Sequence, residues 1–209
     1  MARVGLLGGT FNPPHIAHLV CAQEAHAQLA LDRVLLVPVY APPHKAAEGD
    51  PGVEHRVALC RRAVADDERF GVSRIEADIP GPSFTVDTLR RLHDRHPDDE
   101  LTFILGGDQA QSLRAWREPE GVLALSRLGI AARAGVGRDE VCRDLAGLPG
   151  VPEQLDFFDM PRVDVSSSLI RARVAAGRPI RYLVPDGVAS YIADAGLYRA
   201  AGAVSGVGA

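Results

Sequence analysis

The sequence predicts an α/β protein: a Rossmann-like, doubly wound parallel sheet followed by a small C-terminal helical part. The first reason is that short apolar runs ending at glycine or proline alternate with longer segments of helical composition. The second is the spacing between the runs Val4–Leu7 and Arg33–Val39, which leaves room for one helix and so predicts a parallel pair with a right-handed crossover. The third is that the pattern becomes helical from about residue 160 onward.

The individual elements follow from apolar runs, helix-forming residues, and the glycines and prolines that interrupt them. Strands are expected at residues 4–7, 33–39, 71–75, 101–105, 127–132 and 155–158. Helices are expected at residues 16–31, 54–66, 139–148 and 186–195, from Ser83 or Thr85 to His96, and from the serines at 166–168 to Ala176. Either Ser83 or Thr85 is expected to cap its helix, whereas Arg56, Arg61 and Arg62 are expected to be solvated.

The length of 209 residues and the hydrophobic content of 46% predict one domain with a sizeable core. We expect this domain to cover residues 1–199, with its helical part at about 160–199, and residues 200–209 to form a frayed tail. A net charge of −4 provides no basic field that would recruit nucleic acid or a membrane, and no run is long enough for a transmembrane helix.

The cysteines predict a cytoplasmic protein. Cys21, Cys60 and Cys142 are widely spaced and form no CxxC pair, so reduced thiols are expected. The N-terminal residues also lack the pattern of a secretory signal. The sequence leaves the oligomeric state open and is compatible with a homo-oligomer.

The segment after the first strand predicts a site for a polyphosphate. Gly8 and Gly9 allow a sharp turn and a close approach of a ligand to backbone N–H groups, and Thr10 adds a hydroxyl. Two prolines then delay the next helix until His15, which lies three residues before His18 and so shares a face of the first turn. A helix N-terminus carries unpaired N–H groups and partial positive charge, which favour an anion.

Two other interpretations of this segment fit the sequence less well. A zinc site would need a third ligand, and the neighbourhood contains neither one nor an HExxH pattern. A dinucleotide site would need the GxGxxG fingerprint and an acidic residue after the second strand. Here the glycines are Gly5, Gly8 and Gly9, and Asp32 precedes that strand.

Residues 8–18, which read GGTFNPPHIAH, resemble the GGxFxPxHxGH signature of a superfamily of nucleotidyltransferases. Ala17 stands where that signature has a glycine between the histidines. The resemblance implies that the backbone of Gly8, Gly9, Thr10 and Phe11 binds ATP near its α-phosphate. It also implies that His15 and His18 are catalytic residues that hold the triphosphate, of which His18 is the more essential.

The loop after the second strand contains Lys45, which is the only lysine of the chain. A solvated lysine is the simple interpretation, although every other basic side chain apart from histidine is an arginine. The string Pro42-Pro43-His44-Lys45 resembles the PxxPHK-like element of the same superfamily. The resemblance implies that Lys45, aided by His44, steadies the phosphate of a mononucleotide substrate as a catalytic group.

Two further segments indicate the second substrate. Residues 105–116 read LGGDQAQSLRAW and resemble the LGxDxxxxLxxW pattern of nicotinate-nucleotide adenylyltransferases, and residues 83–89 resemble that family's segment before the pyridine pocket. The resemblance implies that Thr85 and Trp116 take the nicotinate group, Trp116 by stacking. Asp108 orients ribose or a metal-bound water, or else caps a helix. Gly106 and Arg133 border the adenosine pocket.

The string Val165-Ser166-Ser167-Ser168-Leu169-Ile170-Arg171 predicts a second anion site. Hydroxyls at a helix start and a guanidinium one turn later converge on the same end of the helix. Capping explains one serine but not three with Arg171. The string resembles the family's ISSTxIR signature, with Ser168 in place of threonine, which implies that Ser167, Ser168 and Arg171 bind the β- and γ-phosphates of ATP. Arg171 is then a catalytic residue.

The resemblance extends over residues 1 to about 199 and implies transfer of AMP from ATP to nicotinate mononucleotide, with Mg²⁺ brought by ATP. The sequence contains no GxSxG motif and no setting for a catalytic cysteine, which agrees with catalysis by positioning and charge stabilisation. The alternatives are another acceptor, such as nicotinamide mononucleotide, and a regulator that binds nucleotides without turnover.

Overall fold

The computed structural model describes residues 1–41, 49–132 and 137–200 and contains a six-stranded parallel sheet in the order β3-β2-β1-β4-β5-β6. The strands are β1 Arg3–Gly9, β2 Arg33–Pro38, β3 Phe70–Val72, β4 Glu100–Gly106, β5 Arg127–Ala132 and β6 Leu155–Asp159. The register places Leu6 beside Leu35 on one side and Phe103 on the other. This order is that of a Rossmann sheet and confirms the predicted fold class. The strands β1 to β3 extend the sheet in one direction and β4 to β6 extend it in the other, so the strand order reverses between β1 and β4.

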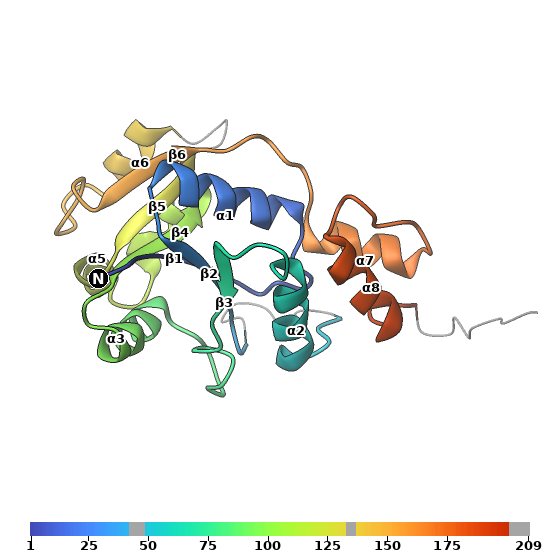
Figure 1. Cartoon of the computed structure of the whole chain (residues 1–209). Helices are drawn as coiled ribbons and strands as arrows, with labels where there is room; N and C mark the ends of the chain where they lie inside the picture. The colour runs from blue at the N-terminus through green and yellow to red at the C-terminus, as the bar shows by residue number, and fades with distance from the viewer. Residues whose placement is uncertain (42–48, 133–136, 201–209) are drawn as a thin grey trace, which may run out of the picture.

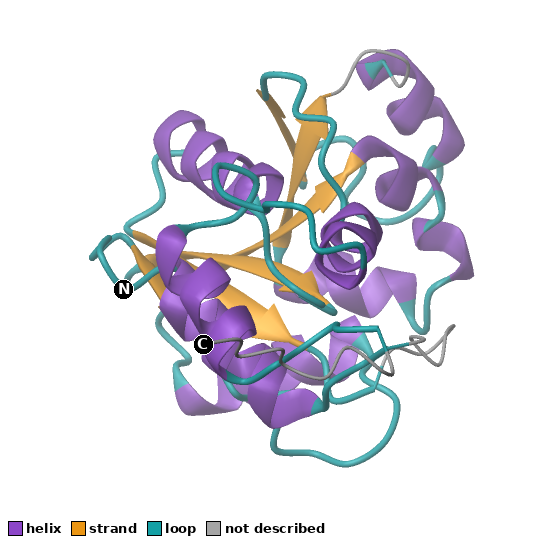
Figure 2. Ribbon diagram, turned by 90° about the vertical axis from the view of Figure 1, so that its right-hand side faces the viewer, coloured by secondary structure: helices purple, strands orange, loops and turns teal. Residues whose placement is uncertain are grey.

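Helices cover both faces of the sheet (Figures 1 and 2). They are α1 Ile16–Gln28, α2 Val53–Ala63, α3 Thr85–Arg95, α4 Gly107–Gln111, α5 Pro119–Leu125, α6 Arg138–Asp144, α7 Ser167–Ala175 and α8 Asp186–Asp194, with a 3₁₀ turn η1 at Leu113–Ala115. Successive strand residues alternate between faces: Leu6 packs in the core with α3 and α5, and Leu7 packs in the core with α1. None of these helices is long and apolar enough to cross a bilayer.

The C-terminal helices α7 and α8 lie at one end of the molecule, beside α2 (Figure 1). Their shared core includes Leu59 of α2, Ile170 of α7 and Val188 of α8. The ring of His55 and the hydroxyl of Tyr191 are 3.0 Å apart and add a polar link between α2 and α8. These contacts support the expectation of one domain over residues 1–199, which stays a prediction. Residues 201–209 of the expected tail lie outside the described residues.

The structure departs from several of the expected elements. The strand expected at 71–75 is shorter and ends at Val72, and the helix expected at 139–148 ends at Asp144. The helices α4 and α5 were not predicted: α4 has only five residues, and α5 begins at Pro119 within a polar segment. The expected caps of α3 are also wrong, since its N-cap is Phe84 and no side chain caps it.

Arg56 corrects a further expectation, because it is buried in the fold. Only 1% of this arginine is exposed, whereas Arg61 and Arg62 are exposed as predicted. The apolar residues Leu59 and Cys60 follow it at three and four positions, so Arg56 lies on the buried stripe of α2.

A buried carboxyl group holds the segment between β3 and α3. Glu76 is 5% exposed, and the Thr88 hydroxyl donates a 2.6 Å hydrogen bond to its Oε1 atom. Its Oε2 atom has no hydrogen-bond partner within the part of the chain that the structure describes. Burial raises the pKa of Glu76, and the hydrogen bond from Thr88 opposes this effect in part. Glu76 thereby connects the start of the segment to helix α3 that follows it.

We predict that Glu76→Gln changes the pH dependence of stability. Because the pKa of Glu76 is raised in the folded protein, its carboxyl contributes most below the unfolded pKa, and this contribution is lost as the pH rises through the folded pKa. The melting temperature of the variant minus that of the wild type should therefore increase between pH 4.5 and pH 8, by roughly 3 °C. Melting curves measured at both pH values test this.

Glu54→Gln is the matched control, because hydrogen bonds from Arg74 lower the pKa of Glu54. The melting temperature of Glu54→Gln minus that of the wild type should not increase between pH 4.5 and pH 8. Equal pH trends for the two variants would contradict the role given to Glu76.

Candidate functional site

Several loops meet at the carboxyl edge of the sheet, beside the point between β1 and β4 where the strand order reverses. The loop that follows β1 contacts the end of β2, since the N–H of Val39 donates to the carbonyl of Gly9 at 3.1 Å. The loop after β2 contacts the segment before α3 through a parallel bridge between Ala41 and Pro82. Ligands of open α/β sheets bind at such a crevice, so the edge is the candidate site.

Gly8 and Gly9 are the last two residues of β1, so the strand extends past the predicted end at Leu7 and the glycines do not form a turn. Both glycines are needed for close packing. A Cβ atom on Gly8 would lie 3.1 Å from the ring of Phe103, and one on Gly9 would lie 3.1 Å from the ring of Phe11. Phe11 has a φ of +50° and is 2% exposed, so its ring supports the loop from the protein side. Its contact with a ligand would therefore be made by its backbone.

The two histidines of the first motif are stacked on each other at the start of α1. Their ring centroids are 3.8 Å apart, with an angle of 27° between the planes. His15 is 6% exposed, and its backbone N–H donates to Nδ1 of the half-buried His18 at 3.1 Å. A neutral His18 then carries its proton on Nε2, which makes this nitrogen a hydrogen-bond donor. Phe11 supports the His18 ring edge-on, at 5.1 Å between centroids.

The second motif touches the first, although about 150 residues separate them. The Ser167 hydroxyl donates to the carbonyl of Pro13 at 2.8 Å, and Nη1 of Arg171 donates to the carbonyl of Asn12 at 2.8 Å. Nη2 of Arg171 donates to the Ser168 hydroxyl at 3.2 Å. These bonds bring the predicted ATP-binding residues of α7 to the loop before α1.

The three serines have different roles. The hydroxyl of Ser166 caps α7 by accepting the N–H of Leu169 at 3.2 Å, as expected for one of them. The exposed Ser168 has its hydroxyl beside Arg171, and Ser167 bonds the first loop. The C-terminal part also reaches the first helix, because the N–H of Ile16 donates to the carbonyl of Leu183 at 3.1 Å.

Arg56 is the residue of the site that the sequence analysis missed. Its Nη1 atom donates to the carbonyl of Thr10 at 3.1 Å and to that of Val39 at 2.7 Å, and its Nη2 atom donates to the carbonyl of Tyr40 at 2.7 Å. Its Nε atom donates to the Asp50 carboxylate at 3.0 Å. The signal in the sequence was its position on the apolar stripe of α2.

The charges of Arg56 and Arg171 belong to one cluster beneath the loop. Both guanidiniums and the Asp50 carboxylate act on the hydroxyl of Tyr198, which is buried and has no hydrogen-bond partner among the described residues. Desolvation by burial is the main reason that the pKa of Tyr198 is raised. The side chain of Arg171 also lies beside Gly49, at 3.9 Å from the position of a Cβ atom there.

The two residues predicted to bind a pyridine ring lie on neighbouring elements. Trp116 is half-buried and meets Phe103 edge-on, at 6.0 Å between ring centroids, and its Nε1 atom donates to the Ser112 hydroxyl at 3.3 Å. The next residue, Arg117, places its guanidinium over the ring of Phe84, at 4.9 Å. Phe84 immediately precedes Thr85, the first residue of α3. Because Phe103 also lies beside Gly8, its ring connects Trp116 to the end of β1.

Asp108 is exposed in the first turn of α4, directly after β4. Its carboxylate folds back over Gly106, where a Cβ atom would lie 2.7 Å from Oδ1. Gly106 is the N-cap of α4, so the alternative in which Asp108 caps a helix is wrong. Three predicted site residues, His44, Lys45 and Arg133, lie outside the described residues.

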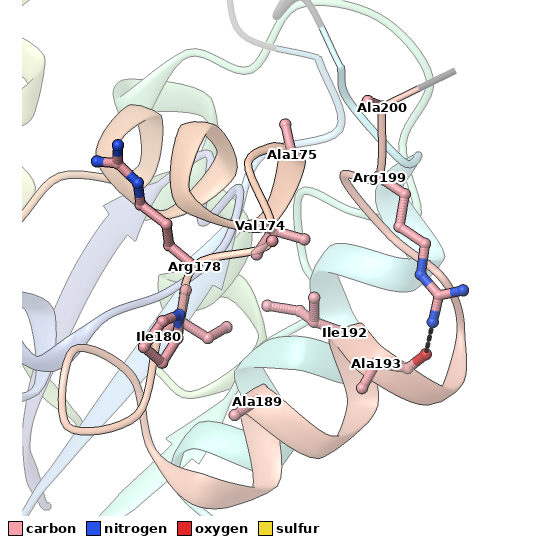
Figure 3. A pocket seen from close by; sticks show the side chains of 11 residues that line it. Val174, Ala175, Arg178, Ile180, Ala189, Ile192, Ala193, Arg199 and Ala200 are labelled. Carbon is pink, nitrogen blue, oxygen red and sulfur yellow. Dashed lines mark hydrogen bonds between the residues drawn. The ribbon is translucent and has the colours of Figure 1, made fainter. Parts of the chain in front are cut away.

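A separate cavity of about 460 Å³ lies between the end of α7 and α8 (Figure 3). Val174, Ile180 and Ile192 line it, and Arg199 lies at its side with a 2.8 Å hydrogen bond to the carbonyl of Ala193. None of its lining residues belongs to either motif or to the pyridine segments. The cavity is therefore distinct from the candidate site.

Comparisons with known proteins indicate the family of the chain. A family model described as cytidylyltransferase-like matches residues 6–173. The probable nicotinate-nucleotide adenylyltransferase of Roseiflexus sp. strain RS-1 is 46% identical over 199 residues, covering 95% of this chain and 98% of that protein. The protein of the same name from Desulfitobacterium hafniense strain Y51 is 41% identical over 198 residues, covering 94% and 96%.

Among solved structures, Plasmodium falciparum nicotinic acid mononucleotide adenylyltransferase complexed with NaAD has a similar fold, with a TM-score of 0.76 at 17% identity. The match covers 95% of this chain and 98% of that chain. The family model and the sequence identities together establish the relationship. The chain belongs to the cytidylyltransferase-like family and, within it, to the nicotinate-nucleotide adenylyltransferases.

Proposed function

We propose that the protein transfers AMP from ATP to nicotinate mononucleotide, giving nicotinate adenine dinucleotide and pyrophosphate in NAD biosynthesis. The observation that carries this proposal is the direct hydrogen bonding between the two phosphate motifs, through Ser167 to Pro13 and Arg171 to Asn12. The names of the relatives add the substrates, since these proteins are called nicotinate-nucleotide adenylyltransferases.

In the proposed reaction, a phosphate oxygen of nicotinate mononucleotide attacks the α-phosphorus of ATP. The bond from this phosphorus to the α–β bridging oxygen breaks, and pyrophosphate leaves with the bonding electrons. Backbone N–H groups from Gly8 to Phe11 and the Nε2 proton of His18 would stabilise the charge on the α-phosphate as the two bonds exchange. His15 holds His18 in place by stacking and through its backbone N–H.

Residues of α7 are proposed to bind the leaving group. Arg171 has five N–H donors and uses two nitrogen atoms for Asn12 and Ser168, so donors remain for a β- or γ-phosphate. Its bond to Asn12 can therefore persist while the guanidinium binds pyrophosphate. Ser168, whose hydroxyl accepts from Arg171, would add a hydroxyl donor at the positive end of the helix. The Ser167 hydroxyl donates its one proton to Pro13, so Ser167 would bind phosphate through its backbone N–H.

Magnesium would arrive as MgATP and would neutralise phosphate charge. Among the described residues there is no group of three or more His, Cys, Asp or Glu side chains that could hold a metal ion. The exposed carboxylate of Asp108, in the first turn of α4, would bind a water of the metal or a ribose hydroxyl. Gly106 beside it, together with Arg133, would border the adenosine.

The pyridine substrate is proposed to lie between α3 and the turn at Trp116. N–H groups at the start of α3, near Thr85, would bind the nicotinate carboxylate, and the indole of Trp116 would stack on the ring. Lys45, with His44, would steady the mononucleotide phosphate; this is the part of the proposal that rests on sequence alone.

The cytoplasm is the proposed setting of the reaction. Cys60 is fully buried in the core, and burial raises the pKa of its thiol, so it stays protonated. A buried structural thiol of this kind is typical of proteins in a reducing compartment.

The experiment that tests the proposed function is an assay of pyrophosphate release from MgATP with nicotinate mononucleotide or nicotinamide mononucleotide. Release with the acid, together with a dinucleotide product of the expected mass, is the predicted result. Release only with the amide would contradict the carboxylate pocket, and no release with either would favour another acceptor or a regulator.

We predict that His18→Ala lowers kcat by about 10²–10³-fold, because it removes a donor to the charged phosphate. His26→Ala is the control, since His26 lies in the last turn of the same helix and contacts Phe70. Steady-state rates and melting temperatures of both variants provide the comparison. A His18→Ala enzyme with a near-normal rate would refute the assigned role.

We predict that Trp116→Ala raises the KM for nicotinate mononucleotide roughly tenfold, as expected for loss of a stacked ring, and changes the KM for ATP much less. Trp116→Phe should restore most of the affinity because it keeps an aromatic face. Initial rates measured while each substrate is varied separate the two constants. Equal increases in both would count against stacking on the pyridine.

A further inference from the structure

Arg56 connects the loop between β1 and α1 to the residues after β2 and to the residues before α2. Its guanidinium bonds the carbonyl of Thr10 after β1, those of Val39 and Tyr40 at the end of β2, and the carboxylate of Asp50 before α2. Asp50 also accepts the N–H of Gly52, at the N-cap of α2, at 2.9 Å. One buried side chain therefore fixes the positions of these segments relative to one another.

The bond to Thr10 sets the direction of the next N–H group. In a trans peptide the carbonyl and the N–H point in opposite directions, and the peptide between Thr10 and Phe11 is trans. Because Arg56 holds the carbonyl, the N–H of Phe11 points away from the guanidinium. Within the part of the chain that the structure describes, this N–H donates to no acceptor.

The loop is held from the other side by α7. Arg171 bonds the carbonyl of Asn12, and Ser167 bonds that of Pro13. Neither of these peptides has an N–H group, because prolines follow both carbonyls. Side chains thus bond three peptide carbonyls of this loop, those of Thr10, Asn12 and Pro13. Of these three peptides, the one between Thr10 and Phe11 has an N–H that it can offer to a ligand.

An arginine suits this role better than a lysine. The planar guanidinium presents donors in a fixed fork and reaches three carbonyls and one carboxylate at once. A lysine would keep the charge but would offer three donors from a single nitrogen atom. The substitution therefore separates the charge of Arg56 from the orientation that it imposes.

We propose that Arg56 is a positioning residue for adenylyl transfer, which holds the peptide between Thr10 and Phe11 so that the Phe11 N–H faces the α-phosphate subsite. The proposal rests on the proposed function for the identity of that subsite. Arg56 does not touch the substrate itself, because it is buried and its bonds are made within the protein.

The test compares Arg56→Lys with Arg61→Lys, an exposed arginine on the same helix. Three quantities are measured for each: the melting temperature, kcat for pyrophosphate release, and the Kd of a non-hydrolysable ATP analogue with Mg²⁺ by calorimetry. We expect Arg56→Lys to lower kcat about 100-fold and to weaken analogue binding about tenfold, the sizes typical of lost or misplaced donors. Arg61→Lys should change both less than twofold.

Chemical rescue gives a second readout that a purely structural role would not produce. Methylguanidinium added to Arg56→Ala should raise kcat at least about tenfold, because it can restore the fork of donors. It should leave the rates of the wild type and Arg61→Lys unchanged. If Arg56→Ala fails to fold, the kcat and analogue Kd of Arg56→Lys decide whether the proposal holds.

A lower melting temperature for folded Arg56→Lys, with kcat and analogue Kd as in the wild type, would overturn the proposal. So would a folded Arg56→Ala that methylguanidinium does not rescue. A wild-type protein that releases no pyrophosphate would refute the proposed function, and the ratio of analogue Kd values would still decide the role of Arg56. Equal Kd values for Arg56→Lys and the wild type would then overturn the proposal, and a higher Kd for Arg56→Lys would support it.

Discussion

The buried guanidinium of Arg56 holds the ends of β1 and β2 together, and the arrangement of the site depends on this interaction. A buried charge needs close partners, and here a carboxylate and three carbonyls provide them. Removing one partner of an ion pair with a buried charge, such as that of Arg56 and Asp50, typically lowers the free energy of unfolding by about 3–5 kcal/mol. The contacts of Arg56 therefore constrain the loop strongly. From the other side, Arg171 and Ser167 take two further carbonyls of the same loop. Side chains therefore bind three carbonyls of this loop, and the N–H of Phe11 has no acceptor among the described residues.

The sheet explains why residues so far apart in the chain meet at this point. Parallel strands place all their carboxyl ends at one edge, and the order with β1 beside β4 opens a crevice there. The loops after β1 and β4 flank the crevice, and α7 closes one side of it by bonding the first loop. The C-terminal helices are thus part of the site, because they supply Ser167, Ser168 and Arg171 from a core shared with α2.

Most of the fold could be predicted because its signals are local. The strands at Val4–Leu7 and Arg127–Ala132 are apolar runs bounded by residues that interrupt them, and both are present. Helix α5 was missed because it begins at Pro119 within polar residues and is stabilised by burial of Val122 and Leu123. The two motifs that the structure brings into contact could likewise be identified from sequence, and their roles stay predictions. Arg56 could not, because an arginine reads as solvated and its partners come from three segments that only the fold brings together.

The most direct test of the account is a crystal structure with a non-hydrolysable ATP analogue and Mg²⁺. The account predicts that the N atom of Phe11 lies within about 3.2 Å of an α-phosphate oxygen, while the carbonyl of Thr10 stays on the guanidinium of Arg56. A complex in which that peptide has turned over, or in which the α-phosphate binds away from Phe11, would contradict it.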